Sequence, residues 1–169
     1  AWLVAAFGQA TDHVTRAVIA NAPHPVIFQR LLLTDPAQRG ASQYMRTFRD
    51  PAHDAVIAEF GLAGLLQTAL TWDARPQYDP AELPLLMQQW TDPETSFAML
   101  NWYRASAVSV PSMDDPFGLP PEYSPPPMPK IEIPTLVVWG TGDEALLPGN
   151  IDGLDEVVSD LTIERIEGA

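Results

Sequence analysis

The chain has 169 residues, 46% hydrophobic and 18% charged, a composition that is typical of a globular core and excludes a wholly disordered chain. Its formal net charge of −13 argues against a nucleic-acid partner and against a polybasic contact with a membrane, because an acidic surface repels phosphate groups. Cysteine is absent, which excludes disulfides and thiolate metal sites, and no apolar run approaches the roughly 18 residues of a membrane-spanning helix.

The first 25 residues predict a piece of an α/β core. Residues 1–7 are all apolar and suit a buried helix, but no Ser, Thr, Asp or Asn stands before them as a cap. We therefore expect this helix to begin in a longer protein. Residues 14–21 are rich in β-branched side chains and predict a strand, which a Pro-containing turn at 22–25 ends.

Residues 26–105 predict a helical domain. Apolar residues recur at roughly i, i+3 and i+4 spacing in five segments, 26–33, 41–48, 52–58, 62–71 and 83–89. Most are separated by Asp-Pro or Arg-Pro steps, and proline disfavours helix in the residue before it. A last helix is expected after Asp92, because Asp92 can cap it, Pro93 suits its first position and Glu94 complements its dipole.

The segment 106–134 contains nine of the 18 prolines. Such a segment favours an extended connector with polyproline II character over helix or sheet.

Residues 135–169 predict a second piece of α/β core. The apolar run 135–139, closed by glycines at 140 and 142, is typical of a buried parallel strand. A helix at 152–158 and a strand at 161–166 would complete a right-handed crossover unit. The chain ends directly after this strand, and we expect that it too continues in a longer protein.

Asp143 is a candidate catalytic residue. It follows the 135–139 strand, and catalytic groups gather beyond the carboxyl ends of parallel strands. An Asp at this place can accept a hydrogen bond from a histidine and orient its ring. The structural alternative is an Asp that caps the backbone of its own turn.

Tyr103 and Tyr44 are candidates for a second role. A phenol can donate a hydrogen bond to an oxygen that gains negative charge in a transition state. For both residues the alternative is an aromatic side chain that packs in a small core.

Nothing in the sequence points to a metal or an organic cofactor. The histidines at 13, 24 and 53 do not form a pair at helical spacing, and the turn at 140–142 lacks the third glycine and the lysine of phosphate-binding loops. The chain has no Gly-x-Ser/Asp-x-Gly nucleophile elbow. The acidic residues between 152 and 160 are typical of a solvated helix face.

Taken together, these segments resemble the middle and late part of an α/β-hydrolase of the epoxide-hydrolase and haloalkane-dehalogenase branch. Residues 1–7 resemble the helix after the nucleophile elbow, and 21–25, Asn-Ala-Pro-His-Pro, resemble the exit into the cap. Residues 133–140 followed by Asp143 resemble the strand and loop that deliver the charge-relay acid, and 161–166 the strand before the catalytic histidine. The resemblance implies an α/β fold in which a helical cap, 26–105, is inserted between core pieces 1–25 and 135–169, with 106–134 as connector.

The cap tyrosines narrow the resemblance to epoxide hydrolases. In that family two cap tyrosines hold the epoxide oxygen, one of them in an Asn-Trp-Tyr-Arg motif, which this chain has at 101–104. Tyr44, which follows a Gln, resembles the second. The resemblance thus implies catalytic roles for Asp143, Tyr103 and Tyr44, and substrate contacts from Trp102 and Phe48. The nucleophilic Asp and the base His of the family have no counterpart in the chain.

The implied reaction converts a small hydrophobic epoxide and water into a vicinal diol through a covalent alkyl-enzyme ester, without metal or organic cofactor. The resemblance is compatible with a homodimer, and the acidic surface with a cytoplasmic protein. The 169-residue chain by itself is expected to be inactive and to fold poorly. The alternatives are a haloalkane or haloacetate dehalogenase, a Ser-type esterase of the same fold, and a non-catalytic relative that acts as a binding module.

Overall fold

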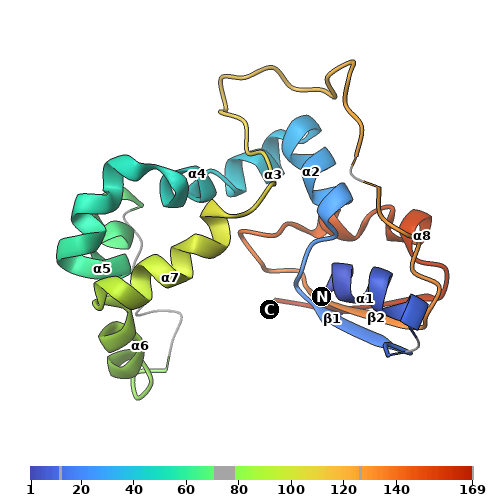
Figure 1. The fold of residues 1–169 in the computed structure, drawn as a ribbon, viewed down its shortest axis with the longest axis horizontal. Coiled ribbons are helices and arrows are strands. Elements are labelled where there is room, and N and C mark those ends of the chain that lie inside the picture. Colours follow the sequence, from blue (N-terminus) through green and yellow to red (C-terminus); the bar gives the residue numbers. More distant parts are fainter. Residues whose placement is uncertain (12, 71–78, 126, 169) are drawn as a thin grey trace. The chain divides into compact units, whose positions relative to one another are not determined.

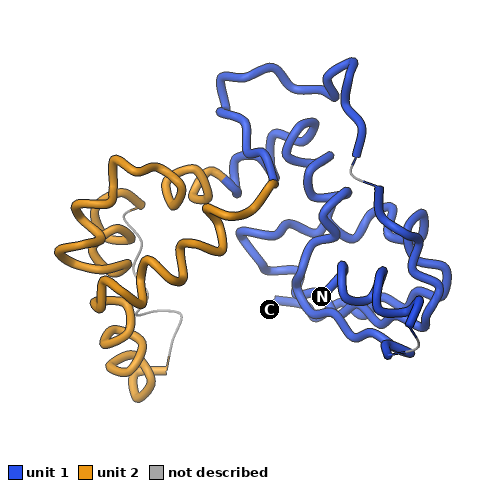
Figure 2. The backbone as a smooth tube through the Cα atoms, in the orientation of Figure 1, with its two compact units in different colours: residues 1–42, 108–169 blue, residues 43–107 orange. Residues whose placement is uncertain are grey.

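The computed structural model describes residues 1–11, 13–70, 79–125 and 127–168. The chain folds into two compact units, shown in blue and orange in Figure 2. Residues 1–42 and 108–169 form the sheet unit, and residues 43–107 form the helical unit.

Three parallel strands form the centre of the sheet unit (Figure 1). They are β1 (Ala17–Ala20), β2 (Thr135–Gly140) and β3 (Leu161–Ile166), in the order β1-β2-β3. Val137 of β2 pairs with Ile19 on one side and Ile163 on the other. This parallel arrangement confirms the predicted α/β fold. β1 lies inside the segment predicted at 14–21, β3 coincides with the one predicted at 161–166, and β2 extends one residue beyond the one predicted at 135–139.

One face of the sheet carries the core of this unit. Val137 and Trp139 are buried there together with Trp2 of α1 (Trp2–Gly8) and Leu154 of α8 (Leu154–Val157). The predicted first helix is confirmed, but its burial is one-sided: three apolar side chains are more than half exposed, Leu3, Val4 and Phe7. The helix predicted at 152–158 is only four residues long, because Gly153 before it has a left-handed backbone, with φ 81°.

Two more helices belong to the sheet unit, α2 (Pro25–Thr34) and α3 (Pro36–Ala41). Asp35 ends α2 and caps α3, since its carboxylate accepts a hydrogen bond of 2.9 Å from the Ala37 N–H. By contacts these helices group with the strands. The cap bounds of 26–105, with the domain bounds on either side, stay predictions.

The described residues of the helical unit form the α-helices α4 (Tyr44–Arg49), α5 (Asp54–Ala69), α6 (Leu83–Trp90) and α7 (Pro93–Arg104). Their core consists of Phe48, Ile57, Leu62, Leu65 and Leu100. The cap predicted for α7 is confirmed: the Asp92 carboxylate accepts a 2.7 Å hydrogen bond from the Thr95 N–H. Hydrogen bonds from the side chain and backbone of Thr95 lower the pKa of Asp92. The prediction of one helix at 41–48 was wrong in one respect: α3 ends at Ala41 and α4 begins at Tyr44, so the segment is divided between two helices.

The two helices predicted at 52–58 and 62–71 are joined through a kink at Gly61, whose φ is 66° and ψ −164°. The kink leaves the N–H of Leu62 without a helical partner, and the buried Ser96 hydroxyl of α7 accepts it at 2.7 Å. Residue 71 lies outside the described part of the chain.

The described residues of 106–134 form no helix or strand apart from a single parallel bridge between Ile131 and Val158. This agrees with the expected lack of helix and sheet, while the role of 106–134 as a connector between domains stays a prediction. The buried Arg39 guanidinium of α3 anchors the connector by donating hydrogen bonds to carbonyls of Ser112, Asp115 and Pro116. No helix in the described part of the chain is both long and apolar enough to cross a membrane.

Candidate functional site

Asp143 lies in the loop that follows the carboxyl end of β2. Its Oδ1 accepts hydrogen bonds from the backbone N–H groups of Ala145 and Leu146, both at 2.8 Å. This is the turn cap that the sequence left open as an alternative. The cap occupies one carboxylate oxygen only, and the side chain is half-buried, so Oδ2 remains available for other donors.

Asn21 supplies a donor to that second oxygen. It directly follows β1, and its Nδ2 donates a 2.7 Å hydrogen bond to Asp143 Oδ2, while its Oδ1 accepts a 2.7 Å hydrogen bond from the Gly140 N–H. The backbone of Asn21 is left-handed, with φ 38°, a conformation that Asn tolerates better than most residues. A carboxylate offers about four lone-pair sites. Three donors therefore leave Oδ2 able to accept one more, which is what an orienting acid needs toward a histidine.

The role of Asn21 was missed by the sequence reasoning. The available signal was topological. Asn21 follows one strand and Asp143 follows another, and the carboxyl ends of neighbouring parallel strands meet at the same sheet edge. The sequence does not show that β1 and β2 are neighbours.

Gln38 of α3 holds the loop after Asp143. Its side chain is fully buried, its Nε2 donates to the Ala145 carbonyl at 2.8 Å, and its Oε1 accepts from the Leu147 N–H at 3.0 Å. The same oxygen accepts a bond from Asn150 Nδ2 at 2.6 Å. Nothing in the local pattern around Gln38 distinguished it from a solvated glutamine.

Tyr44 and Tyr103 come together in the helical unit. Tyr44 is the first residue of α4, Phe48 lies one turn later, and Tyr103 is the penultimate residue of α7. The two tyrosine ring centroids are 5.9 Å apart, and the Phe48 ring lies 5.4 Å from Tyr44 and 4.9 Å from Tyr103, all in edge-on arrangements. Both tyrosines are half-buried, whereas Phe48 belongs to the core. We call these three residues the aromatic cluster.

Trp102 lies apart from that cluster. Its side chain is 82% exposed, and within the described part of the chain it has no ring contact with the three clustered residues. Its substrate contact stays a prediction, as do the roles of the other site residues.

His24 of the sheet unit has a perturbed pKa. It is buried, its ring lies edge-on to Trp2 at 5.1 Å, and burial lowers its pKa to about 4. A neutral, enclosed imidazole of this kind is a packing group. Among the described residues, no three His, Cys, Asp or Glu side chains are placed to hold a metal ion.

Solved structures resemble this chain over nearly its whole length. A novel epoxide hydrolase of the α/β-hydrolase superfamily, from metagenomes of hot environments, is 50% identical with a TM-score of 0.91, over 99% of this chain and 56% of its own. A mutant epoxide hydrolase from Bacillus megaterium, in complex with its naphthyloxy-propanediol product, is 24% identical with a TM-score of 0.69, over 99% and 57%. A laboratory-evolved potato epoxide hydrolase is 18% identical with a TM-score of 0.56, over 99% and 59%.

The similarity to the Bacillus megaterium and potato proteins shows the fold alone, because the sequence identity is below 25%. The 50% identity to the metagenomic protein shows a resemblance in sequence as well as in fold. The predicted resemblance to α/β-hydrolases of the epoxide-hydrolase branch is confirmed. The chain spans between 56% and 59% of the length of these three proteins. No family model matches the chain, and no curated protein matches it.

Proposed function

We propose that this chain is part of an epoxide hydrolase. The observation that supports the proposal most directly is the contact between the rings of Tyr44 and Tyr103. Their rings are 5.9 Å apart although 59 positions separate them in the sequence. The 50% identity to a solved epoxide hydrolase supports the same reading.

In the first chemical step, a carboxylate of the whole protein attacks one epoxide carbon. A C–O bond to that carboxylate forms, and the C–O bond of the strained ring breaks. The electron pair of the broken bond moves to the epoxide oxygen, which is a poor leaving group unless its charge is stabilised as it develops. The hydroxyls of Tyr44 and Tyr103 donate hydrogen bonds to this oxygen, and one of them supplies the proton that makes it a hydroxyl.

In the second step, water attacks the carbonyl carbon of the alkyl-enzyme ester. A histidine takes a proton from that water, the ester C–O bond breaks, and the histidine returns the proton to the departing alkoxide, which leaves as the diol. The proton of the carboxylic acid that forms goes to the tyrosine oxygen that was deprotonated in the first step, so both the carboxylate and the phenol are restored. Asp143 orients this histidine through the remaining acceptor capacity of Oδ2 and stabilises the imidazolium. The resemblance assigns the carboxylate and the histidine to parts of the protein outside these 169 residues.

The substrate class follows from the surroundings of the phenols. The Phe48 ring contacts both tyrosine rings, and it shares a core with Leu100 and Ile57. An apolar wall beside two hydrogen-bond donors suits a small hydrophobic epoxide. A cytoplasmic location and a homodimer belong to the same proposal, and fractionation and gel filtration of the full-length protein test them.

The test is an epoxide-hydrolysis assay on the full-length protein and three variants. We expect diol formation by the wild type and a loss on the order of 100-fold in the first step for Tyr44→Phe or Tyr103→Phe, as for deletion of one oxyanion donor. Tyr123→Phe is a matched control, because it removes a buried hydroxyl of segment 106–134 that has no hydrogen-bond partner among the described residues. It should leave the rate unchanged.

Other outcomes identify the alternatives. Halide release from a haloalkane or haloacetate without diol formation would favour a dehalogenase, and hydrolysis of simple esters alone would favour the Ser-type esterase. Unchanged epoxide turnover in both Tyr→Phe variants would overturn the assigned role of the phenols.

A further inference from the structure

The aromatic cluster depends on how the ends of α4 and α7 are held together. α4 has only six residues, and a helix of that length is not stable by itself. Ring contacts bring Phe48 and Tyr103 to 4.9 Å, but favourable aromatic pairs occur over a range of centroid separations, about 4.5 to 7 Å. A more specific constraint is needed to fix where Tyr44 lies relative to Tyr103.

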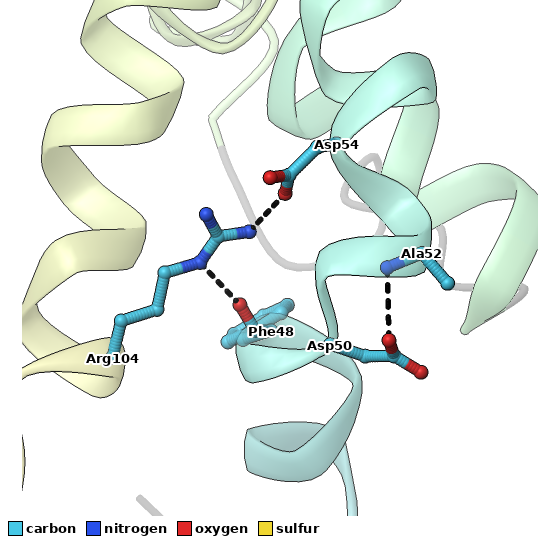
Figure 3. Close-up of polar contacts among 5 residues, drawn as sticks. All are labelled: Phe48, Asp50, Ala52, Asp54 and Arg104. Atoms are coloured by element: carbon cyan, nitrogen blue, oxygen red, sulfur yellow. Dashed lines mark hydrogen bonds and ion pairs between the residues drawn. The ribbon is translucent and has the colours of Figure 1, made fainter.

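Arg104, the last residue of α7, supplies part of that constraint (Figure 3). Its Nε donates a 3.1 Å hydrogen bond to the Phe48 carbonyl, and its Nη2 lies 2.6 Å from Asp54 Oδ1. The Phe48 carbonyl is one of the last in α4 and has no partner within that helix. Asp54 begins α5. One guanidinium therefore joins the ends of three helices.

Arg49, the last residue of α4, makes the reciprocal contact. Its Nε donates a 2.9 Å hydrogen bond to the Tyr103 carbonyl at the end of α7. Phe48 and Tyr103, whose rings touch, thus each have their carbonyl bound by the arginine that follows the other. We call this reciprocal pair, Arg49 and Arg104, the arginine clasp.

We propose that the arginine clasp positions the two phenols for ring opening of the epoxide. This inference rests on the proposed function and assigns Arg49 and Arg104 as positioning residues that act through Tyr44 and Tyr103. By fixing the register of the α4 end against the α7 end, the clasp fixes the separation of two hydroxyls that must both reach one oxygen. Small errors in such placement are costly in rate.

The geometry favours arginine over lysine at position 104. Nε and Nη2 lie on one edge of a planar group, so they can bind the Phe48 carbonyl and the Asp54 carboxylate at fixed directions. A lysine has one nitrogen and no such fork. The Arg104 and Asp54 side chains are 22% and 44% exposed, and ion pairs with that exposure contribute little to stability. The value of the clasp therefore lies in orientation, and its conservative variants should fold.

The experiment measures the two chemical steps separately in the full-length protein, by rapid-quench single turnover of an epoxide. For Arg104→Lys and Arg49→Lys we expect the alkylation rate to fall on the order of 10-fold while the rate of ester hydrolysis stays unchanged. Asp54→Asn, which leaves the bond to Phe48, should cause a smaller loss. Arg30→Lys is the matched control, because Arg30 forms a partly exposed ion pair with Glu156 in the sheet unit. It should change neither step.

A double-mutant cycle decides whether the clasp acts through the phenols. If it does, Arg104→Lys costs less than twofold in a Tyr103→Phe background, because the group that it positions is gone. An equal loss in both backgrounds, or an equal slowing of both steps, overturns the clasp and leaves the proposed function standing. If Arg104→Lys does not fold, Arg49→Lys and Asp54→Asn carry the same cycle. A wild type that forms no diol overturns the proposed function and the clasp together.

Discussion

Asn21 is the residue whose side chain most directly connects the two strand ends of the sheet unit. It bonds Asp143 Oδ2 and the Gly140 N–H, both at 2.7 Å, and so ties the loop after β2 to the end of β1. Alanine is an unsuitable replacement for Asn21, because alanine at φ 38° would add backbone strain of its own. Glycine removes the amide without that strain.

We therefore expect Asn21→Gly to slow ester hydrolysis on the order of 10-fold, because Asp143 loses a donor that fixes its orientation toward the histidine. Alkylation should keep its rate, which is the reverse of the pattern expected for the clasp variants. Rapid-quench single turnover measures both. Gln88→Ala deletes an exposed amide and serves as the control. Equal slowing of both steps by Asn21→Gly would contradict a role through Asp143.

The buried His24 makes the free energy of unfolding depend on pH. Burial lowers its pKa to about 4, whereas an unfolded chain binds the proton at about 6.5. The unfolded state therefore holds more protons between these values, and the free energy of unfolding falls as pH drops from about 6.5 to about 4. The full difference corresponds to roughly 3 kcal/mol.

His24→Phe should remove that pH dependence, since a phenylalanine does not titrate and can keep the edge contact with Trp2. Urea unfolding of the full-length protein at pH 7.5, 6 and 4.5 measures the effect as a change of slope. The control His53→Gln should leave the slope of the wild type intact. A slope that is the same in the wild type and His24→Phe would show that another group controls it.

At the scale of elements, the kink of α5 depends on contacts with α6 and α7. Gly61 has φ 66°, and a Cβ placed there would overlap the carbonyl oxygen of Trp90, where α6 ends. We expect Gly61→Ala to lower the free energy of unfolding by more than about 2 kcal/mol, the left-handed penalty plus the overlap. Gly40→Ala is a contrasting control. Its Cβ would meet only Met113 Cε at 3.9 Å, so it should be stabilising by about 0.5 to 1 kcal/mol. Thermal or urea unfolding distinguishes the two signs.

The same kink shows which elements could be read from the sequence and which could not. The 135–139 and 161–166 strands and the α7 cap were predictable, because an apolar run closed by glycines, an alternation of apolar and polar residues and an Asp-Pro-Glu step are all local signals. The division of 41–48 into two helices and the kink at Gly61 were not. Ser96, which binds the Leu62 N–H inside the kink, lies 34 positions away, and no local pattern reports such a contact.

The candidate site divides in the same way. Asp143, Tyr44 and Tyr103 could be selected by motif and residue type, since the role proposed for each belongs to its own carboxylate or hydroxyl group. Asn21, Gln38 and Arg104, to which we assign supporting roles, make hydrogen bonds to residues 56 to 122 positions away. Their selection requires knowing which strand ends and helix ends are neighbours. Sequence reasoning thus identified candidates for the chemistry and missed the residues that support them.

At the scale of the whole molecule, the proposed mechanism needs four kinds of group, and the described residues carry two of them: the phenols and the orienting acid. In the described part of the chain Asp143 is bonded to Asn21, Ala145 and Leu146, and no histidine is among its donors. The helical unit and the sheet unit each have a core of their own. The sheet unit also exposes apolar side chains on α1 and at Val18, which is 71% exposed.

From this we expect the 169-residue chain, produced alone, to show no epoxide turnover, because catalytic groups that act as a unit lose most of their effect when one is removed. We also expect it to bind a hydrophobic dye more strongly than the full-length protein, since large exposed apolar patches are uncommon on soluble monomers. Diol formation and dye fluorescence, measured side by side on the two proteins at equal concentration, test both statements. Steady turnover by the 169-residue chain at the full-length rate would place the nucleophile and the base within these residues and would contradict the mechanism proposed above.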